Sequence, residues 1–215
     1  MDIISLYDQL FQKYGDLKWW PAGTHEEIII GAVLTQNTSW KNVEISISKL
    51  KENGNCSLQA ISEMNPESLK EQIRSSGFFN RKAQVLKKLS DSVIMNGGLE
   101  SMNTWADMDL DLFFSGMFGI GKETLDSILL YAFYRKRFVV DKYTNNFFSR
   151  IGLLNNNENA ESLRKNIEGS LSVEQLKNFH AMIVNIGKDH CKAKPQCAGC
   201  FMKNSCDHAK ETMFP

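Results

Sequence analysis

Apolar residues recur at helical spacing along most of this chain, and that repeat restricts the fold more than any other feature. They return every three or four positions in four segments, 28–33, 43–50, 85–93 and 125–132. The strict alternation typical of half-buried strands is almost absent. Breakers rich in Gly, Pro and Asn separate the segments, at 19–23, 53–55, 97–98 and 155–157. The pattern predicts an all-α protein of about ten short helices.

One helix start carries its own capping signal. Thr24 stands three residues before Glu27, directly ahead of the apolar segment 28–33. In a Thr-x-x-Glu capping box the two side chains satisfy free amides at the helix start. We therefore expect a helix to begin after Thr24.

The composition is that of an ordinary globular protein. Lys and Arg number 25 and so do Asp and Glu, so overall charge gives no support for nucleic-acid binding. A local basic footprint lies at 134–150, where five basic residues oppose Asp141 alone, although a solvated turn explains that run equally well. The N-terminus does not resemble a signal peptide, and no apolar stretch reaches the roughly 18 residues of a membrane span. We expect a cytoplasmic, nucleoid-associated monomer without membrane contact.

Four of the five cysteines crowd into sixteen residues near the C-terminus, as Cys191-x5-Cys197-x2-Cys200-x5-Cys206. Short loops bring thiolates together at little entropic cost, and in a reducing compartment such a quartet indicates a metal centre. Zinc and a [4Fe–4S] cluster are both feasible, and the single Cys-x-x-Cys pair favours iron–sulfur over structural zinc. His190 and His208 flank the quartet and could replace a cysteine around zinc. Cys56 stands alone and is expected to be a free thiol.

A tight glycine hairpin lies near the middle of the chain. Gly119 and Gly121 flank Ile120 between two helical segments, and Lys122 opens the second segment. Two glycines allow a sharp turn and expose amides at a helix start, where the positive end of the dipole suits a phosphate. Such a site would hold DNA by its backbone, although any helix–helix turn can use glycine.

An apolar run at 138–140 ends abruptly in Asp141, twenty residues after Gly121. One interpretation is that Asp141 is the N-cap of a helix starting at Lys142, a common use of Asp. The other is that it is a functional carboxylate. Both can hold at once.

The cysteine loop, the hairpin and the aspartate that follows it together resemble the endonuclease III superfamily of DNA glycosylases. That family's commoner cysteine spacing is x6-x2-x5, whereas the first gap here is x5. The resemblance implies that Gly119, Gly121 and Lys122 bind DNA, that Asp141 is catalytic and that the cysteines hold a [4Fe–4S] cluster. Breaking an N-glycosidic bond builds positive charge on the sugar, which a fixed carboxylate stabilises while it orients the attacking water.

Further motifs, over roughly residues 17–190, look closest to the 3-methyladenine DNA glycosylase III branch; they lie at 19–21, 34–38, 76–80, 119–123 and 139–143. This likeness implies that Gln36 enters the stack vacated by a flipped base and that Phe78 is a wedge on the opposite strand, although an aromatic is more often core. It also implies a base pocket, in which aromatic walls suit a cationic methylated purine. The pocket candidates are Trp19, Trp20, Trp40, His180 and Lys188. The best-known member of the branch lacks the cysteine cluster and has a lysine where this chain has Met182.

Bifunctional members of the superfamily form a Schiff base through a lysine at the second position after Gly-x-Gly. Here that position is Glu123, and the adjacent Lys122 is rotated by about 100° around the helix. We therefore predict a monofunctional glycosylase of base excision repair, acting on damaged double-stranded DNA without AP lyase activity. The alternatives are a bifunctional glycosylase and AP lyase for oxidised pyrimidines, a non-catalytic DNA-binding protein on the same scaffold, and a zinc-stapled helical module.

The resemblance also implies two helical subdomains with a cleft between them. The first would be a helical barrel with the helix-hairpin-helix, at residues 24–134. The second would combine residues 1–23 and 135–215 and carry the cluster loop at 191–206.

Overall fold

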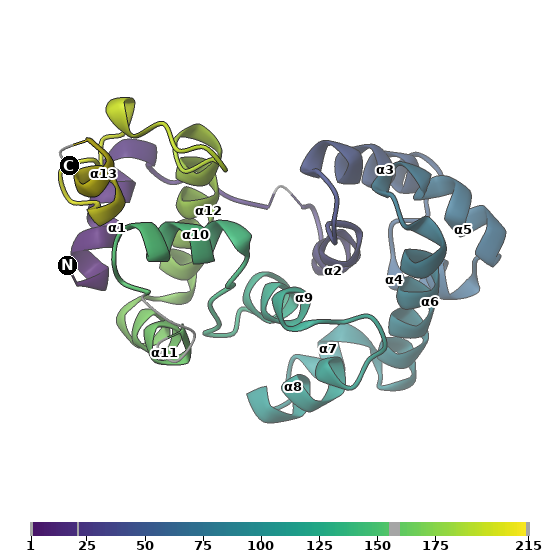
Figure 1. Ribbon diagram of the computed structural model, residues 1–215. Coiled ribbons are helices and arrows are strands. Elements are labelled where there is room, and N and C mark those ends of the chain that lie inside the picture. The colour runs from purple at the N-terminus through teal and green to yellow at the C-terminus, as the bar shows by residue number, and fades with distance from the viewer. Residues whose placement is uncertain (1, 21, 155–159, 214–215) are drawn as a thin grey trace. The chain divides into compact units, whose positions relative to one another are not determined.

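The computed structural model describes residues 2–20, 22–154 and 160–213. Every regular element in these ranges is a helix and none is a strand, so the predicted all-α class is confirmed. Contacts divide the chain into two compact units (Figure 1). We call Trp20–Arg135 the central unit, and Met1–Trp19 with Lys136–Pro215 the terminal unit.

The terminal unit is built around one long helix. Its elements are α1 (Ile3–Tyr14), α10 (Lys142–Arg150), α11 (Ala160–Ser170), α12 (Val173–Asp189), the 3-10 turn η4 (Cys197–Gly199) and α13 (Asp207–Met213). Both α1 and α10 pack against α12. Three buried rings, Phe138, Phe148 and Phe179, lie with their centroids 5.6 to 6.4 Å apart and form the centre of this core.

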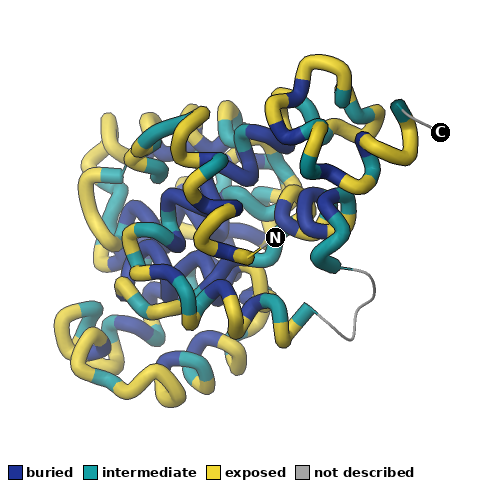
Figure 2. Tube along the Cα trace, turned by 90° about the vertical axis from the view of Figure 1, so that its left-hand side faces the viewer, coloured by how far each residue is buried: buried dark blue, intermediate teal, exposed yellow. Residues whose placement is uncertain are grey.

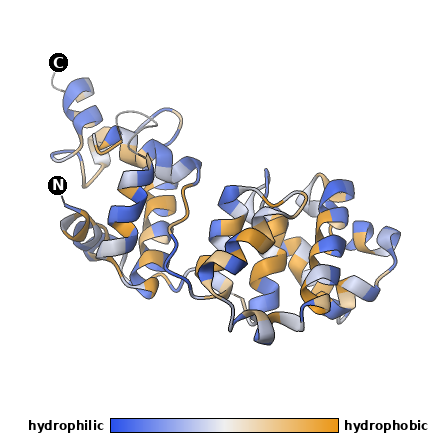
Figure 3. Ribbon diagram, turned by 90° about the horizontal axis from the view of Figure 1, so that it is seen from below, coloured by the Kyte–Doolittle hydropathy of each residue, from blue (hydrophilic) through white to orange (hydrophobic). Residues whose placement is uncertain are grey.

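The central unit surrounds a helix that is apolar on nearly every side. Its elements are α2 (His25–Leu34), α3 (Trp40–Glu52), α4 (Leu58–Glu63), α5 (Pro66–Gln72), η1 (Arg74–Ser76), α6 (Phe79–Met95), α7 (Gly98–Met102), α8 (Asp107–Ser115), α9 (Lys122–Ser127) and a π-helical turn, η2 (Ile128–Ala132). Helix α2 is buried from Glu27 to Leu34 and packs against α3, α6, α9 and η2. A helix buried all round is expected at a core, and the apolar residues of both units gather inside them (Figure 3).

Helix starts follow the predicted capping chemistry with one difference. The Thr24 hydroxyl accepts a hydrogen bond from the Glu27 amide at 3.1 Å, as expected. The Glu27 carboxylate, however, accepts from the amide of Gly23 at 2.8 Å and pairs with Lys51 at 2.6 Å. Both side chains therefore serve the start of α2, but the return bond reaches one residue further back than in a regular capping box.

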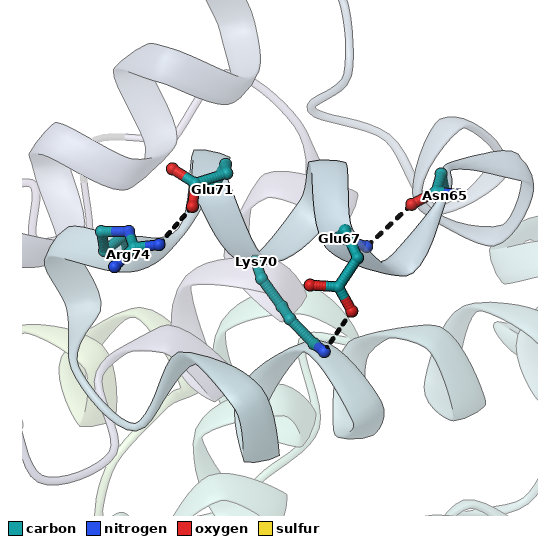
Figure 4. Close-up of polar contacts among 5 residues, drawn as sticks. All are labelled: Asn65, Glu67, Lys70, Glu71 and Arg74. Atoms are coloured by element: carbon teal, nitrogen blue, oxygen red, sulfur yellow. Dashed lines mark hydrogen bonds and ion pairs between the residues drawn. The ribbon is translucent and has the colours of Figure 1, made fainter.

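The hydrophobic repeat underestimated the number of helices because several of them are short. The described residues contain thirteen α-helices, against about ten expected, and α4, α5 and α7 are only five to seven residues long. Local polar contacts set the bounds of α5: the Asn65 side chain caps it, and Lys70 and Arg74 pair with Glu67 and Glu71 (Figure 4). Such signals are too local to give a hydrophobic repeat.

Burial follows the helical repeat in both units, so that buried and exposed residues are interleaved along most of the helices (Figure 2). Among the residues that the structure describes, no helix is both long enough and apolar enough to cross a membrane.

Candidate functional site

Asp141 caps the N-terminus of α10, so the first interpretation of this residue is confirmed. Its Oδ1 atom accepts a hydrogen bond from the Thr144 amide at 2.8 Å. The buried Thr144 hydroxyl donates to the Val139 carbonyl at 3.2 Å, which holds the cap against the preceding apolar run. The carboxylate keeps 15% of its side-chain surface exposed. The carboxylate is therefore held by the start of α10 and keeps one side open to solvent.

His180 of α12 faces the same carboxylate. Its Nε2 atom lies 3.6 Å from Asp141 Oδ2, and its side chain is 7% exposed. Burial raises the pKa of Asp141, but the interactions with His180 and with Thr144 outweigh it and leave this pKa below its ordinary value. Asp141 is thus held as a carboxylate at neutral pH. The sequence offered His180 as a pocket candidate and gave no sign of this pairing, because 39 residues separate the two side chains.

The remaining candidates of the terminal unit lie on α12 and beside α1. The exposed Lys188 ammonium lies 5.3 Å from the centre of the Trp19 ring, a cation–π distance. Met182 is fully buried in the core. Helix α12 therefore presents His180 to Asp141 and Lys188 to Trp19, and contributes Met182 only to packing.

The cysteine loop follows α12 and is bound to the end of α10. Cys200 and Cys206 are buried, Cys191 and Cys197 are half-buried, and none forms a disulfide. Burial raises the pKa of Cys191 and Cys200, and the charges of the neighbouring cysteines raise both further. Arg150 Nη1 donates to the Cys191 carbonyl at 2.5 Å, and Cys206 Sγ donates to the Arg150 carbonyl at 3.3 Å.

Within the described ranges, no three His, Cys, Asp or Glu side chains are arranged to hold a single metal ion. As a donor set the quartet still fits a cluster, because one short loop supplies four thiols and two of them, Cys200 and Cys206, are buried. In a four-iron cluster each thiolate binds a different iron, so the sulfurs do not converge on one centre as they do around zinc. The cluster and its zinc alternative remain predictions.

The hairpin of the central unit joins α8 to α9. Gly119 has a φ of +82°, and a Cβ atom added there would lie 2.3 Å from Val85 Cγ2. Gly121 has a φ of −88° and is the N-cap of α9. Lys122 and Glu123 form the exposed first turn of that helix. The turn is therefore the helix-hairpin-helix that the spacing predicted, and Gly119 is the position where only glycine fits.

Gln36 is tied directly to this hairpin. Its Nε2 atom donates to the Gly119 carbonyl at 2.9 Å and to the Thr124 hydroxyl at 3.0 Å. The two contacts span 83 and 88 residues of sequence, so no local pattern could have shown them. The turn after α2 and the hairpin are therefore joined by the hydrogen bonds of the Gln36 side chain.

Two exposed rings lie near the start of α6 and on the hairpin. Phe78 is 69% exposed and has a φ of +44°, which is uncommon for a residue other than glycine. Phe118 is 51% exposed, and the cationic groups of Arg81 and Lys88 lie 5.4 and 5.0 Å from its ring centre. The sequence singled out Phe78 only. No local pattern marks Phe118, because its cationic partners Lys88 and Arg81 lie 30 and 37 residues earlier in the chain.

Trp20 and Trp40 form the wall of a cavity of about 140 Å³ inside the central unit. Their rings meet edge to face at 5.5 Å, and Trp20 also packs on Tyr131 and against Gly31. Trp40 Nε1 donates to Glu44 Oε1 at 2.8 Å. Glu27, Glu44 and Lys51 also line the cavity, so its charged groups carry a net charge of −1. The cavity suits a flat, positively charged group.

Comparison with known proteins defines the class. The family model of the HhH-GPD superfamily base excision DNA repair proteins matches residues 30–172. This match spans the hairpin, Gln36, Phe78 and Asp141. The chain belongs to this family, which makes it a DNA glycosylase of base excision repair.

Individual relatives agree with this assignment. The chain is 40% identical over 209 residues to a protein that carries the name of a DNA repair glycosylase in Methanocaldococcus jannaschii, with 95% of each covered. It is 27% identical to the endonuclease III of Sulfolobus acidocaldarius, covering 84% of this chain and 80% of that protein. A solved structure of Helicobacter pylori 3-methyladenine DNA glycosylase bound to 1,N6-ethenoadenine is 29% identical, with a TM-score of 0.76 over 88% of this chain and 98% of that one. A non-covalent endonuclease III–DNA complex, 22% identical, shares the fold with a TM-score of 0.80 over 99% and 97%.

Proposed function

We propose that this protein is a monofunctional DNA glycosylase in which Asp141 is the catalytic carboxylate. The observation that carries the proposal is the geometry of Asp141, with one oxygen on the Thr144 amide and the other beside His180; these contacts also keep the pKa of Asp141 below its ordinary value. Hydrolysis of an N-glycosidic bond builds positive charge on the sugar, and a preorganised anion lowers the energy of that state. The exposed side of the carboxylate orients the attacking water.

Strand cleavage is not part of this function. A lyase step needs a neutral amine that forms a Schiff base with the sugar. The family position for that amine holds Glu123, and Lys122 beside it projects about 100° away around α9. Hydrolysis should therefore leave an intact strand with an abasic site.

The substrate is an alkylated purine. A methylated purine carries a positive charge, which aromatic rings and carboxylates attract, and it is a good leaving group that needs little acid catalysis. Trp20, Trp40 and the adjacent Glu44 supply such an environment in the central unit. The Helicobacter pylori relative was solved with the modified base 1,N6-ethenoadenine bound, which supports the same class of base.

Double-stranded DNA is the partner. The hairpin amides at Gly121 and Lys122 would bind a backbone phosphate. Gln36 would fill the space left by the extruded base, and Phe78 would separate the opposite strand. The exposure of Phe78 supports the wedge role, and Gln36 is hydrogen-bonded to the hairpin that would bind the phosphate.

The cysteine loop would hold a [4Fe–4S] cluster through Cys191, Cys197, Cys200 and Cys206. Bound there, the cluster supplies a covalent cross-link of the loop, and hydrolysis requires no electron transfer from it. An iron–sulfur centre gives the purified protein broad absorption in the blue part of the visible spectrum, whereas zinc leaves it colourless. Metal analysis with the visible spectrum distinguishes the two.

Substitution of Asp141 by Asn tests the mechanism. Asn is as good an N-cap as Asp, so α10 should keep its start while the negative charge is lost. Single-turnover release of 3-methyladenine from duplex DNA should fall by about two to three orders of magnitude, with unchanged affinity for DNA that carries an abasic analogue. Full activity in this variant would refute the role of Asp141.

A substrate panel tests the base class. Duplexes carrying 3-methyladenine, 7-methylguanine, uracil, thymine opposite guanine or an oxidised pyrimidine are incubated with the protein, and released bases are identified by mass spectrometry. Release of methylated purines alone is expected, and nicking appears only after alkali. Release of oxidised pyrimidines with nicking in the absence of alkali would identify the bifunctional alternative instead.

A further inference from the structure

Lys82 is a buried lysine that the catalytic proposal does not use. It lies in the first turn of α6 with 2% of its surface exposed, on the same helix face as the buried Leu86 and Leu89. Burying an ammonium group is costly unless other groups compensate the charge. No carboxylate in the described part of the chain pairs with Lys82, and burial lowers the pKa of Lys82 to about 8. The position therefore needs an explanation.

The compensation comes from two backbone carbonyls. Lys82 Nζ donates to the Leu34 carbonyl at 2.8 Å and to the Ser76 carbonyl at 2.6 Å. Leu34 is the last residue of α2, and Ser76 is the last residue of η1. Carbonyls at helix ends lack intrahelical partners and carry partial negative charge, so one ammonium group serves both.

Each of the two carbonyls lies just before a turn that carries a proposed DNA-binding residue. Gln36 follows Leu34 by two residues, and Phe78 follows Ser76 by two. Gly77 and Phe78 both have positive φ, +68° and +44°, so the exposed ring sits on a sharply turned backbone. Lys82 thus links the two segments at their bases, 48 and 6 residues away in sequence.

We propose that Lys82 is a positioning residue that fixes the Gln36 turn and the Phe78 turn relative to each other, so that both side chains enter the DNA stack together. This inference rests on the proposed function, because it concerns how a base is extruded from duplex DNA. Lys82 itself contacts neither DNA nor the reacting atoms. Its effect is on the geometry of insertion.

The chain offers a matched control on the same helix. Lys87 also donates to two carbonyls, those of Ser62 and Met64. These lie at the end of α4, away from both proposed insertion segments in sequence. Lys82→Met and Lys87→Met therefore each remove an ammonium that caps a helix end, and only the first disturbs the bases of the Gln36 and Phe78 turns.

The test measures unstacking of the base opposite the lesion, without catalysis. A duplex with an abasic analogue opposite 2-aminopurine reports unstacking as a rise in fluorescence at saturating protein, at a temperature well below the unfolding midpoint of every variant. The fluorescence rise should be mostly lost in Lys82→Met and partly retained in Lys82→Gln, which keeps one donor group. Lys87→Met should give the same rise as the wild type.

A second readout compares the excision rate from a paired duplex with the excision rate of the same lesion in a bulge. In Lys82→Met the rate should fall by about tenfold or more on the paired duplex and by much less on the bulge.

Each outcome is decisive. Equal losses in the paired and bulged substrates, or equal behaviour of Lys82→Met and Lys87→Met, would overturn the positioning role and leave Lys82 as a stabilising residue only. If Lys82→Met does not fold, the response of Lys82→Gln decides by the same criteria. A wild-type protein that unstacks the 2-aminopurine but excises none of the panel refutes the proposed catalytic function alone, and one that excises a lesion without unstacking the 2-aminopurine refutes the role of Lys82.

Discussion

Replacing Gly119 by Ala should destabilise the central unit far more than the same change at Gly121, although the two glycines are separated by one residue. A Cβ atom at Gly119 would lie 2.3 Å from Val85 Cγ2, whereas carbon atoms in contact prefer about 3.5 to 4.0 Å. Relieving such an overlap in a packed core costs about 1 to 3 kcal/mol. Holding Ala at a φ of +82° adds about 1 to 2 kcal/mol.

Gly121 is a control with the opposite geometry. Its φ is −88°, and nothing lies within 4 Å of an added Cβ. Ala there lowers the entropy of the unfolded chain by about 0.4 to 1 kcal/mol and weakens the N-cap of α9 by a similar amount. The two terms nearly cancel. We therefore expect a loss of about 3 kcal/mol for Gly119→Ala and a change below about 1 kcal/mol for Gly121→Ala.

Urea unfolding followed by far-ultraviolet circular dichroism measures both values, provided that the slope of the transition is the same in each variant. Adding Val85→Ala to Gly119→Ala separates the two costs, because it removes the clashing methyl group and leaves the unfavourable φ. The double-mutant cycle should give a favourable coupling of about 1 to 3 kcal/mol. Similar free energies for the two glycine variants, or additive effects of Val85→Ala and Gly119→Ala, would refute the steric account of the hairpin.

Three further predictions concern single substitutions. Gly187→Ala should destabilise the terminal unit by about 1 to 3 kcal/mol in thermal unfolding, because its Cβ would lie 2.4 Å from the Tyr143 ring; an unchanged midpoint would contradict this. Burial lowers the pKa of Lys82 from its reference value of 10.5 to about 8 in the folded protein, so between pH 8 and 10.5 the unfolded chain binds more protons at this residue. The free energy of unfolding of the wild type, relative to that of Lys82→Met, should therefore rise over this range by about 3 kcal/mol at most. The same difference at pH 7 and pH 10.5 would refute that shift. Asp141→Ala should cost about 1 kcal/mol through loss of the N-cap, whereas Asp141→Asn should be near neutral in the same urea titration; equal losses would show that the carboxylate stabilises the fold by its charge.

The sequence predicted the elements whose signals are local. The helical repeat gave the all-α class, Asp141 preceded a polar helix start, and the glycine spacing marked the hairpin. What it missed depends on contacts distant in sequence: the bonds of Gln36 to the hairpin and the pairing of His180 with Asp141. Neither leaves a periodic trace, since each requires the packing of helices whose relative placement no local pattern specifies.

Lys82 combines a local signal, which the sequence shows, with distant partners, which it does not. A lysine on the apolar face of α6, four and seven residues before Leu86 and Leu89, is a local sign of a buried charge. The sequence could therefore have identified an unusual lysine, since a charge at such a position is rarely buried without a partner. It could not have identified the partners, because both are backbone carbonyls, which have the same chemistry at every residue.

Helix α10 connects the proposed catalytic carboxylate to the cysteine loop. Asp141 caps its first turn, and Arg150 in its last turn is bound to the backbone of Cys191 and the thiol of Cys206. Nine helical residues place these ends about 13 Å apart, too far for direct contact. A loop cross-linked by a metal cluster would therefore act on Asp141 by fixing the far end of a rigid helix. That mechanical role would need no change in the oxidation state of the proposed cluster, so it is compatible with the proposed hydrolytic reaction.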